Sequence, residues 1–317
     1  MAQSSIVSTD TKLLFVFTKE GLNTNQTIDI AQCLSVVNRR FYRQGMNYAV
    51  SSIEAFASES GARVGVGIIP TTWVADNSTT KAFMNWKEQR AEVLKVSPSL
   101  KAKWSDFKIF MDAQHAAAGT VGNLTPVDPA DNPYLLGEWE ASQFVVPVTG
   151  GSGGAGGAQE VTMHVVGDHT PPGAFNNLVT SSSLIKSYAD SRAIVLAPDP
   201  VQPPGYNTNM YLRESSHDEM AADLIQNITN LNDLPPYDLD DHPGGDTNAP
   251  ILQYFDDLRL NNFGDAAQFS SDSTGGLVVP FGLLRLQFSN MEDDERVAIV
   301  VNCVPGSYKG VMAEVGV

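Results

Sequence analysis

Residues 277–304 read LVVPFGLLRLQFSNMEDDERVAIVVNCV and hold two dense strand patterns, at 277–289 and 296–304. Both ends of it are dense in Val, Leu, Ile and Phe, which is typical of strands. Similar patterns recur earlier in the chain and bring the number of predicted strands to eight. The strands are residues 12–18, 47–58, 62–70, 104–112, 138–148, 159–166, 277–289 and 296–304. Eight antiparallel strands with long connections indicate an all-β protein with a jelly-roll fold.

Two helices are predicted among the early strands. Residues 26–44 carry apolar residues with the 3.6-residue period of an amphipathic helix, and Asn25 is the candidate cap. The apolar face consists of Ile30, Cys33, Leu34, Val37 and Phe41. Residues 79–96 form the second predicted helix, which Pro98 ends because proline cannot continue it. Residues 47–70 between the helices read as a β-hairpin.

The chain divides into three predicted parts. Residues 1–167 hold the first six strands with the two helices, and residues 276–317 hold the final strands and a C-terminal tail. Residues 168–275 are rich in Pro, Asn, Asp and Gly, so we expect a loop-rich acidic insertion ahead of the seventh strand. Short helices are predicted within it at residues 217–231 and 250–260, where apolar residues line one face. Such an insertion suits a surface projection or a contact between subunits.

Charge is distributed unevenly along the 317 residues. The chain has 36 acidic and 20 basic side chains and a net charge of −16. Residues 1–110 carry 13 basic and 9 acidic side chains, a net charge of +4, whereas the remainder carries −20. Generic nucleic-acid binders and membrane-surface proteins are basic, because phosphate attracts Lys and Arg. The composition therefore argues against DNA wrapping by charge alone and predicts two surfaces that face different environments.

Neither a targeting segment nor a membrane span is expected. The first residues lack the basic and apolar regions of a secretory signal. No apolar run reaches the roughly 18 residues that a membrane helix requires. The two cysteines, Cys33 and Cys303, lie in apolar patterns and are predicted to be buried free thiols.

The sequence contains no convincing catalytic motif. Residues 150–157 match the letters of a dinucleotide loop and of a nucleophile elbow at Ser152, but a strand pattern follows where both motifs need a helix. Asp168 and His169 precede Pro171 and read as a turn rather than an acid–base pair. We therefore expect a binding or assembly protein and not an enzyme. A hydrolase that uses Ser152 or the His169 region is the alternative.

Two charged clusters are candidate binding sites. Arg39, Arg40 and Arg43 fall in the last turns of the first predicted helix and suit either nucleic-acid phosphate or an acidic neighbouring subunit. An acidic loop carries oxygen ligands of the kind that Ca²⁺ prefers, although their order is not that of an EF-hand. These ligands belong to Asp238, Asp240, Asp241 and Asp246, and a solvated turn is the alternative. No other cofactor is expected.

Seven further segments share an order with one group of known proteins. They are CLSVVNRRFYRQG at 33–45, PTTWV at 70–74, FMNW at 83–86, DFKIFMD at 106–112, GTVGNLTPVD at 119–128, GEW at 137–139 and VPGSYKGVMAE at 304–314. In this order they resemble segments in capsid proteins of small circular single-stranded DNA viruses, a group known largely from marine metagenomes. The resemblance rests on the number and order of the segments, since none of them is a mechanistic motif.

The resemblance implies an eight-stranded viral jelly roll that self-assembles into an icosahedral shell, the virion capsid, around a single-stranded DNA genome. Many such coat proteins begin with an Arg/Lys-rich arm, whereas residues 1–20 contain only Lys12 and Lys19, so any packaged DNA is expected without a basic arm. One alternative is the capsid protein of a single-stranded DNA bacteriophage, with a double jelly roll over an internal membrane. Another is a carbohydrate-binding β-sandwich of a fibre or spike. Its candidate sugar-site residues are Tyr206, Tyr211, Tyr237 and Tyr254.

Overall fold

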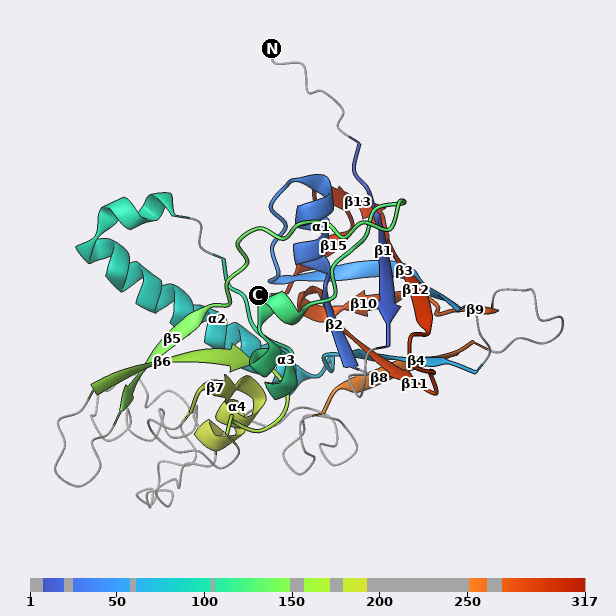
Figure 1. Cartoon of the computed structure of the whole chain (residues 1–317). Coiled ribbons are helices and arrows are strands. Elements are labelled where there is room, and N and C mark those ends of the chain that lie inside the picture. The colour runs from blue at the N-terminus through green and yellow to red at the C-terminus, as the bar shows by residue number, and fades with distance from the viewer. Residues whose placement is uncertain are drawn as a thin grey trace, which may run out of the picture.

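Two antiparallel β-sheets with one hydrophobic core between them dominate the structure (Figure 1). The computed structural model describes residues 8–19, 25–57, 61–103, 106–148, 157–171, 179–192, 251–260 and 270–316. The first sheet has the order β1 (Lys12–Thr18), β12 (Arg296–Cys303), β3 (Met46–Ala57) and β10 (Leu277–Val279), with β9 (Ser270–Ser273) and β15 (Ala313–Val315) also paired to β3. The second sheet has the order β2 (Asn25–Asp29), β11 (Leu283–Ser289), β4 (Arg63–Ile68) and β8 (Gln253–Arg259). The predicted all-β class is confirmed at this level.

Strand pairing in the two sheets follows one nested pattern. β1 pairs with β12, β2 with β11, β3 with β10, and β4 with β8, and every pair is antiparallel. The strands β1 to β4 therefore pair in reverse order with β8, β10, β11 and β12. Along these eight strands the chain changes sheet at every step except from β4 to β8, which are neighbours in the second sheet. Each sheet is completed by a further contact, because β12 also pairs with β3 and β11 also pairs with β4.

The core between the sheets follows from the period-2 alternation of the strands. In β1 and β12 every second residue is buried, and the buried set includes Leu13, Phe15, Ile299 and Val301. The opposite sheet contributes residues such as Leu286 and Phe288. The rings of Phe17 and Phe288 stack between the sheets with centroids 4.0 Å apart. Since successive strand residues point to opposite faces, this alternation fixes which face of each strand enters the core.

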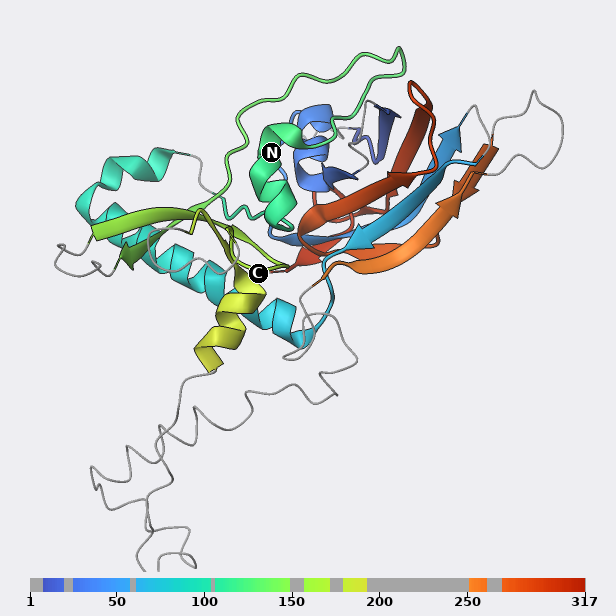
Figure 2. The same ribbon diagram turned by 60° about the horizontal axis from the view of Figure 1, so that its bottom comes forward.

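A second unit is inserted between β4 and β8 and packs against one end of the sandwich (Figure 2). It holds a three-stranded sheet and two helices, namely β5 (Gln143–Val148), β6 (Gly157–His164), β7 (Ser181–Ser183), α2 (Trp73–Val96) and α4 (Leu184–Arg192). Its hydrophobic cluster also includes Ile69, Phe281 and Leu283, which belong to the connections and strands of the sandwich. The two units therefore share apolar contacts.

The remaining described elements are short; η1 follows the end of α2, and the others lie elsewhere along the chain. They are α1 (Ile30–Asn38), η1 (Pro98–Ala102), α3 (Ala113–Ala118), η2 (Thr120–Gly122), η6 (Pro280–Gly282), β13 (Pro305–Gly306) and β14 (Gly310–Val311). Both cysteines are free and buried, as predicted. No helix among the described residues is long and apolar enough to cross a membrane.

Several strands were predicted correctly, but their partners were not. The predicted hairpin at 47–70 is wrong, because β3 and β4 belong to different sheets and the chain crosses between them. The predicted strands 138–148 and 159–166 correspond to the antiparallel pair β5–β6, which lies outside the two-sheet sandwich. Alternation shows that a segment is a strand but does not choose its neighbour, which is set by pairing over long sequence distances.

Three element assignments also need correction. Residues 25–29 form strand β2 rather than the start of a helix, because they pair with β11 and Asp29 instead of Asn25 caps the helix. The predicted strand at 104–112 is wrong over its described residues, 106–112, which form no strand and have one isolated bridge, between Phe110 and His164. The predicted helix at 250–260 is strand β8, in which only Leu258 is buried. Aromatic residues favour strands, and pairing with β4 overrides the short helical periodicity.

The expected position of the long insertion also differs. In the structure the longest interruption of the sandwich separates its fourth strand, β4, from its fifth, β8, and not the seventh strand from the preceding segments. The predicted strand at 277–289 contains both β10 and β11, which η6 divides into strands of different sheets. The left-handed backbone of Phe281 and Gly282, with φ of 55° and 67°, makes this change of direction.

Candidate basic pocket at the end of helix α1

The chain around α1 presents two arginines to a pocket. The Asp29 carboxylate accepts a hydrogen bond from the backbone N–H of Gln32 at 3.1 Å and so begins the helix. The helix ends after Asn38, because Arg39 adopts a left-handed conformation with φ of 50° and its N–H donates to the carbonyl of Ser35. The helix was predicted to run to residue 44, but α1 ends at Asn38. The three arginines therefore follow the helix and do not occupy its last turns.

The three arginines are close in sequence but have different surroundings. The exposed Arg39 side chain has no ion pair within the part of the chain that the structure describes. Arg40 donates from Nη1 to the hydroxyl of Thr9 at 3.3 Å. Arg43 is exposed, and its Nε lies 4.0 Å from the carboxylate of Asp106, a largely buried side chain, so the two form a long ion pair. Arg39 and Arg40 line the pocket, whereas Arg43 lies outside it.

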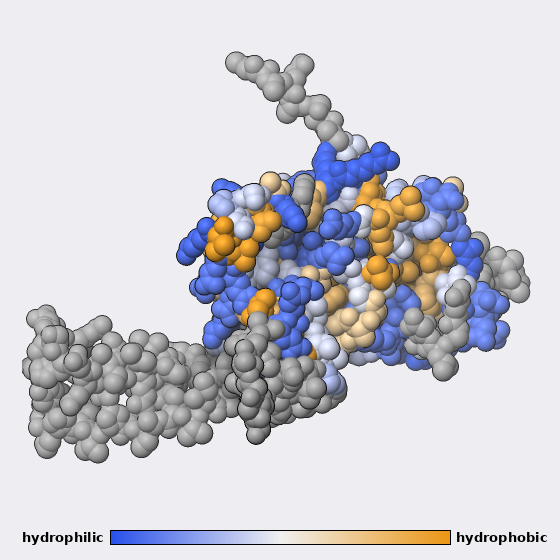
Figure 3. All heavy atoms as spheres, turned by 60° about the vertical axis from the view of Figure 1, so that its left-hand side comes forward, coloured by the Kyte–Doolittle hydropathy of each residue, from blue (hydrophilic) through white to orange (hydrophobic). Residues whose placement is uncertain are grey.

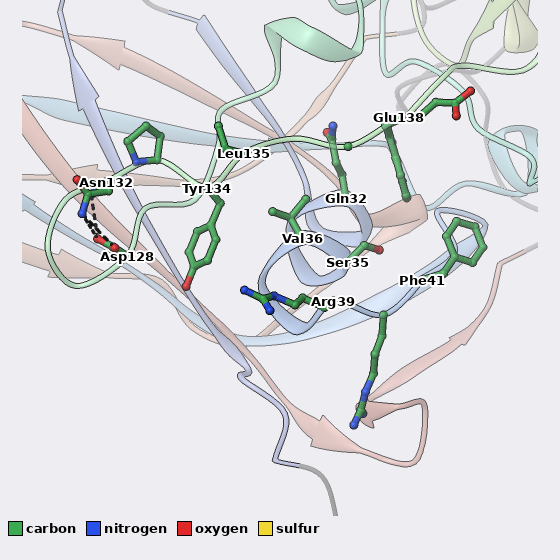
Figure 4. A pocket seen from close by; sticks show the side chains of 14 residues that line it. Gln32, Ser35, Val36, Arg39, Phe41, Asp128, Asn132, Tyr134, Leu135 and Glu138 are labelled. Carbon is green, nitrogen blue, oxygen red and sulfur yellow. Dashed lines mark hydrogen bonds between the residues drawn. The ribbon is translucent and has the colours of Figure 1, made fainter.

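The pocket lies between α1 and the extended segment 128–139 and has a volume of about 630 Å³ (Figure 4). This volume is within the range of small-molecule and cofactor sites. Its lining combines apolar and aromatic side chains with charges of both signs. It includes Gln32, Ser35, Val36, Arg39, Arg40, Phe41, Asp128, Asn132, Pro133, Tyr134, Leu135, Gly137, Glu138 and Trp139.

Two lysines from distant parts of the chain extend the basic cluster. The Lys108 ammonium lies 4.6 Å from the centre of the Trp139 ring and 5.9 Å from that of Phe41. The Lys309 ammonium lies 5.8 Å from the centre of the Phe41 ring and 5.5 Å from that of Tyr308. These distances allow cation–π attraction. We refer to Arg39, Arg40, Arg43, Lys108 and Lys309 as the basic cluster.

A buried hydrogen-bond network fixes the floor of the pocket. The Asp29 carboxylate, which is fully buried, accepts from Gln44 Nε2 at 3.0 Å and from the indole N–H of Trp139 at 2.9 Å. The other end of the Gln44 amide accepts from the backbone N–H of Ile109 at 2.6 Å. Burial raises the pKa of the Asp29 carboxyl from 3.8 to about 6, and the hydrogen bonds oppose that rise. The network joins four separate segments beneath the basic cluster.

The pocket supplies binding groups for anions and for flat apolar groups. Guanidinium groups bind phosphate or carboxylate oxygens, and aromatic surfaces pack on planar rings. Trp139, Lys108, Lys309 and Asp29 were missed as site residues when the sequence was read alone. All four lie within or beside the segments that resemble coat proteins. The number and order of these segments were the signal in the sequence that could have pointed to these residues.

The other predicted sites are only partly covered by the structure. Asp238, Asp240, Asp241 and Asp246 lie outside the described residues, and the described residues contain no group of three or more candidate metal ligands. Ser152 and three of the four candidate sugar-site tyrosines also lie outside them. The fourth, Tyr254, is 65% exposed on β8 and donates a hydrogen bond to Gln287.

The predicted turn does not fall on the Asp168–His169 pair, because the chain bends at residues 165–167 and these two residues are in neither a turn nor a bend. The Asp168 carboxylate accepts from the backbone N–H of His169 at 2.8 Å. The His169 ring accepts from the backbone N–H of Ser183 at 3.2 Å, and its Nδ1 lies 3.4 Å from the Ser182 hydroxyl. These contacts hold the ring in a local network that connects to β7.

Comparison with known proteins identifies no relative. No known protein family, no curated protein and no solved structure matches this chain. The fold and the pocket are therefore the basis for the functional argument.

Proposed function

We propose that this protein is a viral coat protein with a jelly-roll fold, which assembles through copies of itself into an icosahedral shell around a single-stranded DNA genome. The observation that carries the proposal is the nested strand order of the two sheets. Rolling up a ribbon of four antiparallel strand pairs gives this order, and double-sheet jelly rolls occur in viral capsid domains as well as in lectins and cupins. The order alone does not choose among these classes, so further features are needed.

Four of the seven segments that resemble coat proteins, 33–45, 106–112, 137–139 and 304–314, meet in space, whereas 70–74 and 83–86 belong to α2 and its start. Arg43 in the first of them approaches Asp106 in the segment 106–112, and the Tyr42 hydroxyl donates to the carbonyl of Lys309 at 2.9 Å. Lys108 lies over Trp139 in the segment 137–139. Segments that are scattered in the sequence thus build one end of the sandwich. This supports the resemblance, because unrelated chance matches have no reason to form a single structural unit.

The outer half of α2 offers surface for contacts between subunits. Val74, Ala75, Ser78, Thr79 and Ala82 in the first half of the helix are buried, but the second half projects from the body of the protein (Figure 2). Val96, near its end, is 85% exposed. On the side of the molecule drawn in Figure 3, hydrophobic side chains gather in separate patches among hydrophilic ones. Exposed apolar patches mark interaction sites when they are contiguous.

The deciding experiment is electron microscopy and sedimentation of the purified chain over a series of salt and Ca²⁺ concentrations. We expect closed particles of regular diameter in at least one condition. A folded monomer in every condition, with no particles, would refute the proposal. Glycan-array binding by such a monomer would then favour the carbohydrate-binding alternative.

A further inference from the structure

We propose that the pocket at the end of α1 binds a short segment of single-stranded DNA, with phosphates on the basic cluster and a base against the apolar wall. Binding of DNA to the pocket requires no shell. The additional conclusion that this end of the subunit faces the genome rests on the proposed coat function.

Positive charge is concentrated at the end of α1. The chain has 20 basic side chains and a net charge of −16, yet five of the basic residues meet at this one end. Arg39 and Arg40 have no ion pair among the described residues, and the contacts of the Arg40 side chain there are with the hydroxyls of Thr9 and Tyr42. Both guanidinium groups can therefore take phosphate oxygens without first breaking an internal salt bridge.

The lining of the pocket contains two carboxylates, Asp128 and Glu138, which leave its middle free. The Asp128 carboxylate is already engaged by its own loop, because it accepts from the backbone N–H groups of Ala130 and Asn132 at 2.8 and 2.9 Å. Figure 4 shows Asp128 beside Asn132 at one edge of the pocket and the Glu138 carboxylate pointing away from Arg39. The middle of the pocket therefore presents Arg39 and the side chains around it rather than a carboxylate.

The pocket also has an apolar wall, which favours an unpaired base. Val36, Phe41, Tyr134 and Leu135 line the pocket, and Leu135 is 92% exposed. Proteins that bind single strands combine a basic groove with side chains on which bases stack, whereas the bases of a duplex are already stacked inside the helix. A pocket of about 630 Å³ has room for a nucleotide base with its sugar.

Hydrogen bonds hold the backbone segments around the pocket in place. The indole of Trp139 is anchored to Asp29 at 2.9 Å, and this bond ties the segment 128–139 to the start of α1. The backbone of Arg39 is held by the hydrogen bond of its own N–H to the carbonyl of Ser35. A site held in this way loses little conformational freedom when the ligand binds.

The test measures fluorescence anisotropy of a labelled oligo-dT of about ten nucleotides with unassembled protein, and a duplex of equal length serves as competitor. We expect the association constant to fall with salt. The logarithm of this constant plotted against the logarithm of the salt concentration should have a slope of about −2, which corresponds to three phosphates contacted on a single strand. The double variant Arg39→Glu/Arg40→Glu should weaken binding by at least about tenfold. Leu135→Asp should also weaken it, and this exposed position carries no risk for folding. Circular dichroism checks that each variant is folded.

Lys95→Glu is the matched control, because it reverses an exposed charge on α2, away from the pocket, and should change the affinity less than about twofold. Equal weakening by the control and the pocket variants would overturn the inference. So would the absence of oligo-dT binding, equal competition by duplex, or equal competition by polyglutamate, which would indicate an acidic-peptide site. Particles that form without any DNA binding would refute only this inference, whereas DNA binding without particles would refute only the coat function.

Discussion

Asp29 should make the stability of this protein depend on pH in a direction opposite to that of a typical paired carboxylate. Its pKa is raised to about 6 in the folded state, compared with 3.8 in an exposed peptide. Between these values the folded protein binds more protons than the unfolded chain does. The stability that this group contributes is therefore present below pH 3.8 and is lost as the pH rises through about 6. Two pH units correspond to about 3 kcal/mol in total.

The variant Asp29→Asn removes this titration while it keeps the shape of the side chain. Its absolute stability is hard to interpret, because both Asp29 oxygens accept hydrogen bonds, Oδ1 from the Gln32 N–H and Oδ2 from Gln44 and Trp139, so the new amide nitrogen faces a donor in either orientation. The difference between wild type and variant at two pH values is the informative quantity. From the two pKa values, wild type should gain about 2 kcal/mol relative to the variant on going from pH 7.5 to pH 4.5. Other titrating groups cancel in this comparison, including His115, whose pKa burial lowers to about 4.

The assay is urea unfolding of unassembled protein at the two pH values, followed by tryptophan fluorescence. Glu138→Gln is the matched control, because it removes an exposed carboxylate from the same pocket. A difference between wild type and Asp29→Asn that stays constant within about 0.5 kcal/mol would refute the reasoning, since Asp29 would then titrate alike in both states.

Three further substitutions test the packing of the fold. Phe288→Ala removes a ring that stacks on Phe17 at 4.0 Å and should lower the free energy of unfolding by about 3–5 kcal/mol in urea titrations; a loss below 1 kcal/mol would contradict the assigned core. Asp112→Ala leaves the buried Arg285 guanidinium without the carboxylate that it contacts at 2.7 Å and should cost about 3–5 kcal/mol, most of which Arg285→Leu should restore in the double variant. Gly310→Ala should cost about 1–3 kcal/mol, because this residue has φ of 101° and a Cβ there would lie 2.4 Å from the Thr9 hydroxyl; an unchanged thermal midpoint would contradict the close approach.

The local parts of the fold could be predicted from the sequence, whereas the pairings could not. β1 coincides with its prediction, because alternation over residues 12–18 needs no information from elsewhere. The apolar face of α1 was also correct at Ile30, Cys33 and Leu34, which are buried. In contrast, the partners of β3 lie more than 200 residues away in β12 and β10, and those of β4 lie at least 185 residues away in β8 and β11, as the pair Ile68–Gln253 shows. Pairing at that distance leaves no periodic signal within either strand.

The candidate site was predictable only where its residues are neighbours in sequence. Arg39 and Arg40 stand out as a cluster, but Lys108 and Lys309 are single lysines in otherwise unremarkable segments. They meet at Phe41 because the nested strand order returns the end of the chain to the start of β1, where Lys12 pairs with Asn302. The position of Asp29 depends on the same order, since β2 ends where the helix begins.

The nested order also turns the uneven charge of the sequence into a polarity in space. The basic cluster lies at the end of the sandwich where β1 begins. The acidic turn 292–295 lies at the opposite end, where Thr18 pairs with Arg296 and the backbone N–H of Lys19 donates to the carbonyl of Glu295. The seven residues of β1 separate the two ends by about 23 Å, which is more than two Debye lengths at physiological salt. A polyanion should therefore respond to each end separately. In a shell of like-oriented subunits, the end with the basic cluster would favour contact with the genome, and the reverse orientation would place four carboxylates against phosphate.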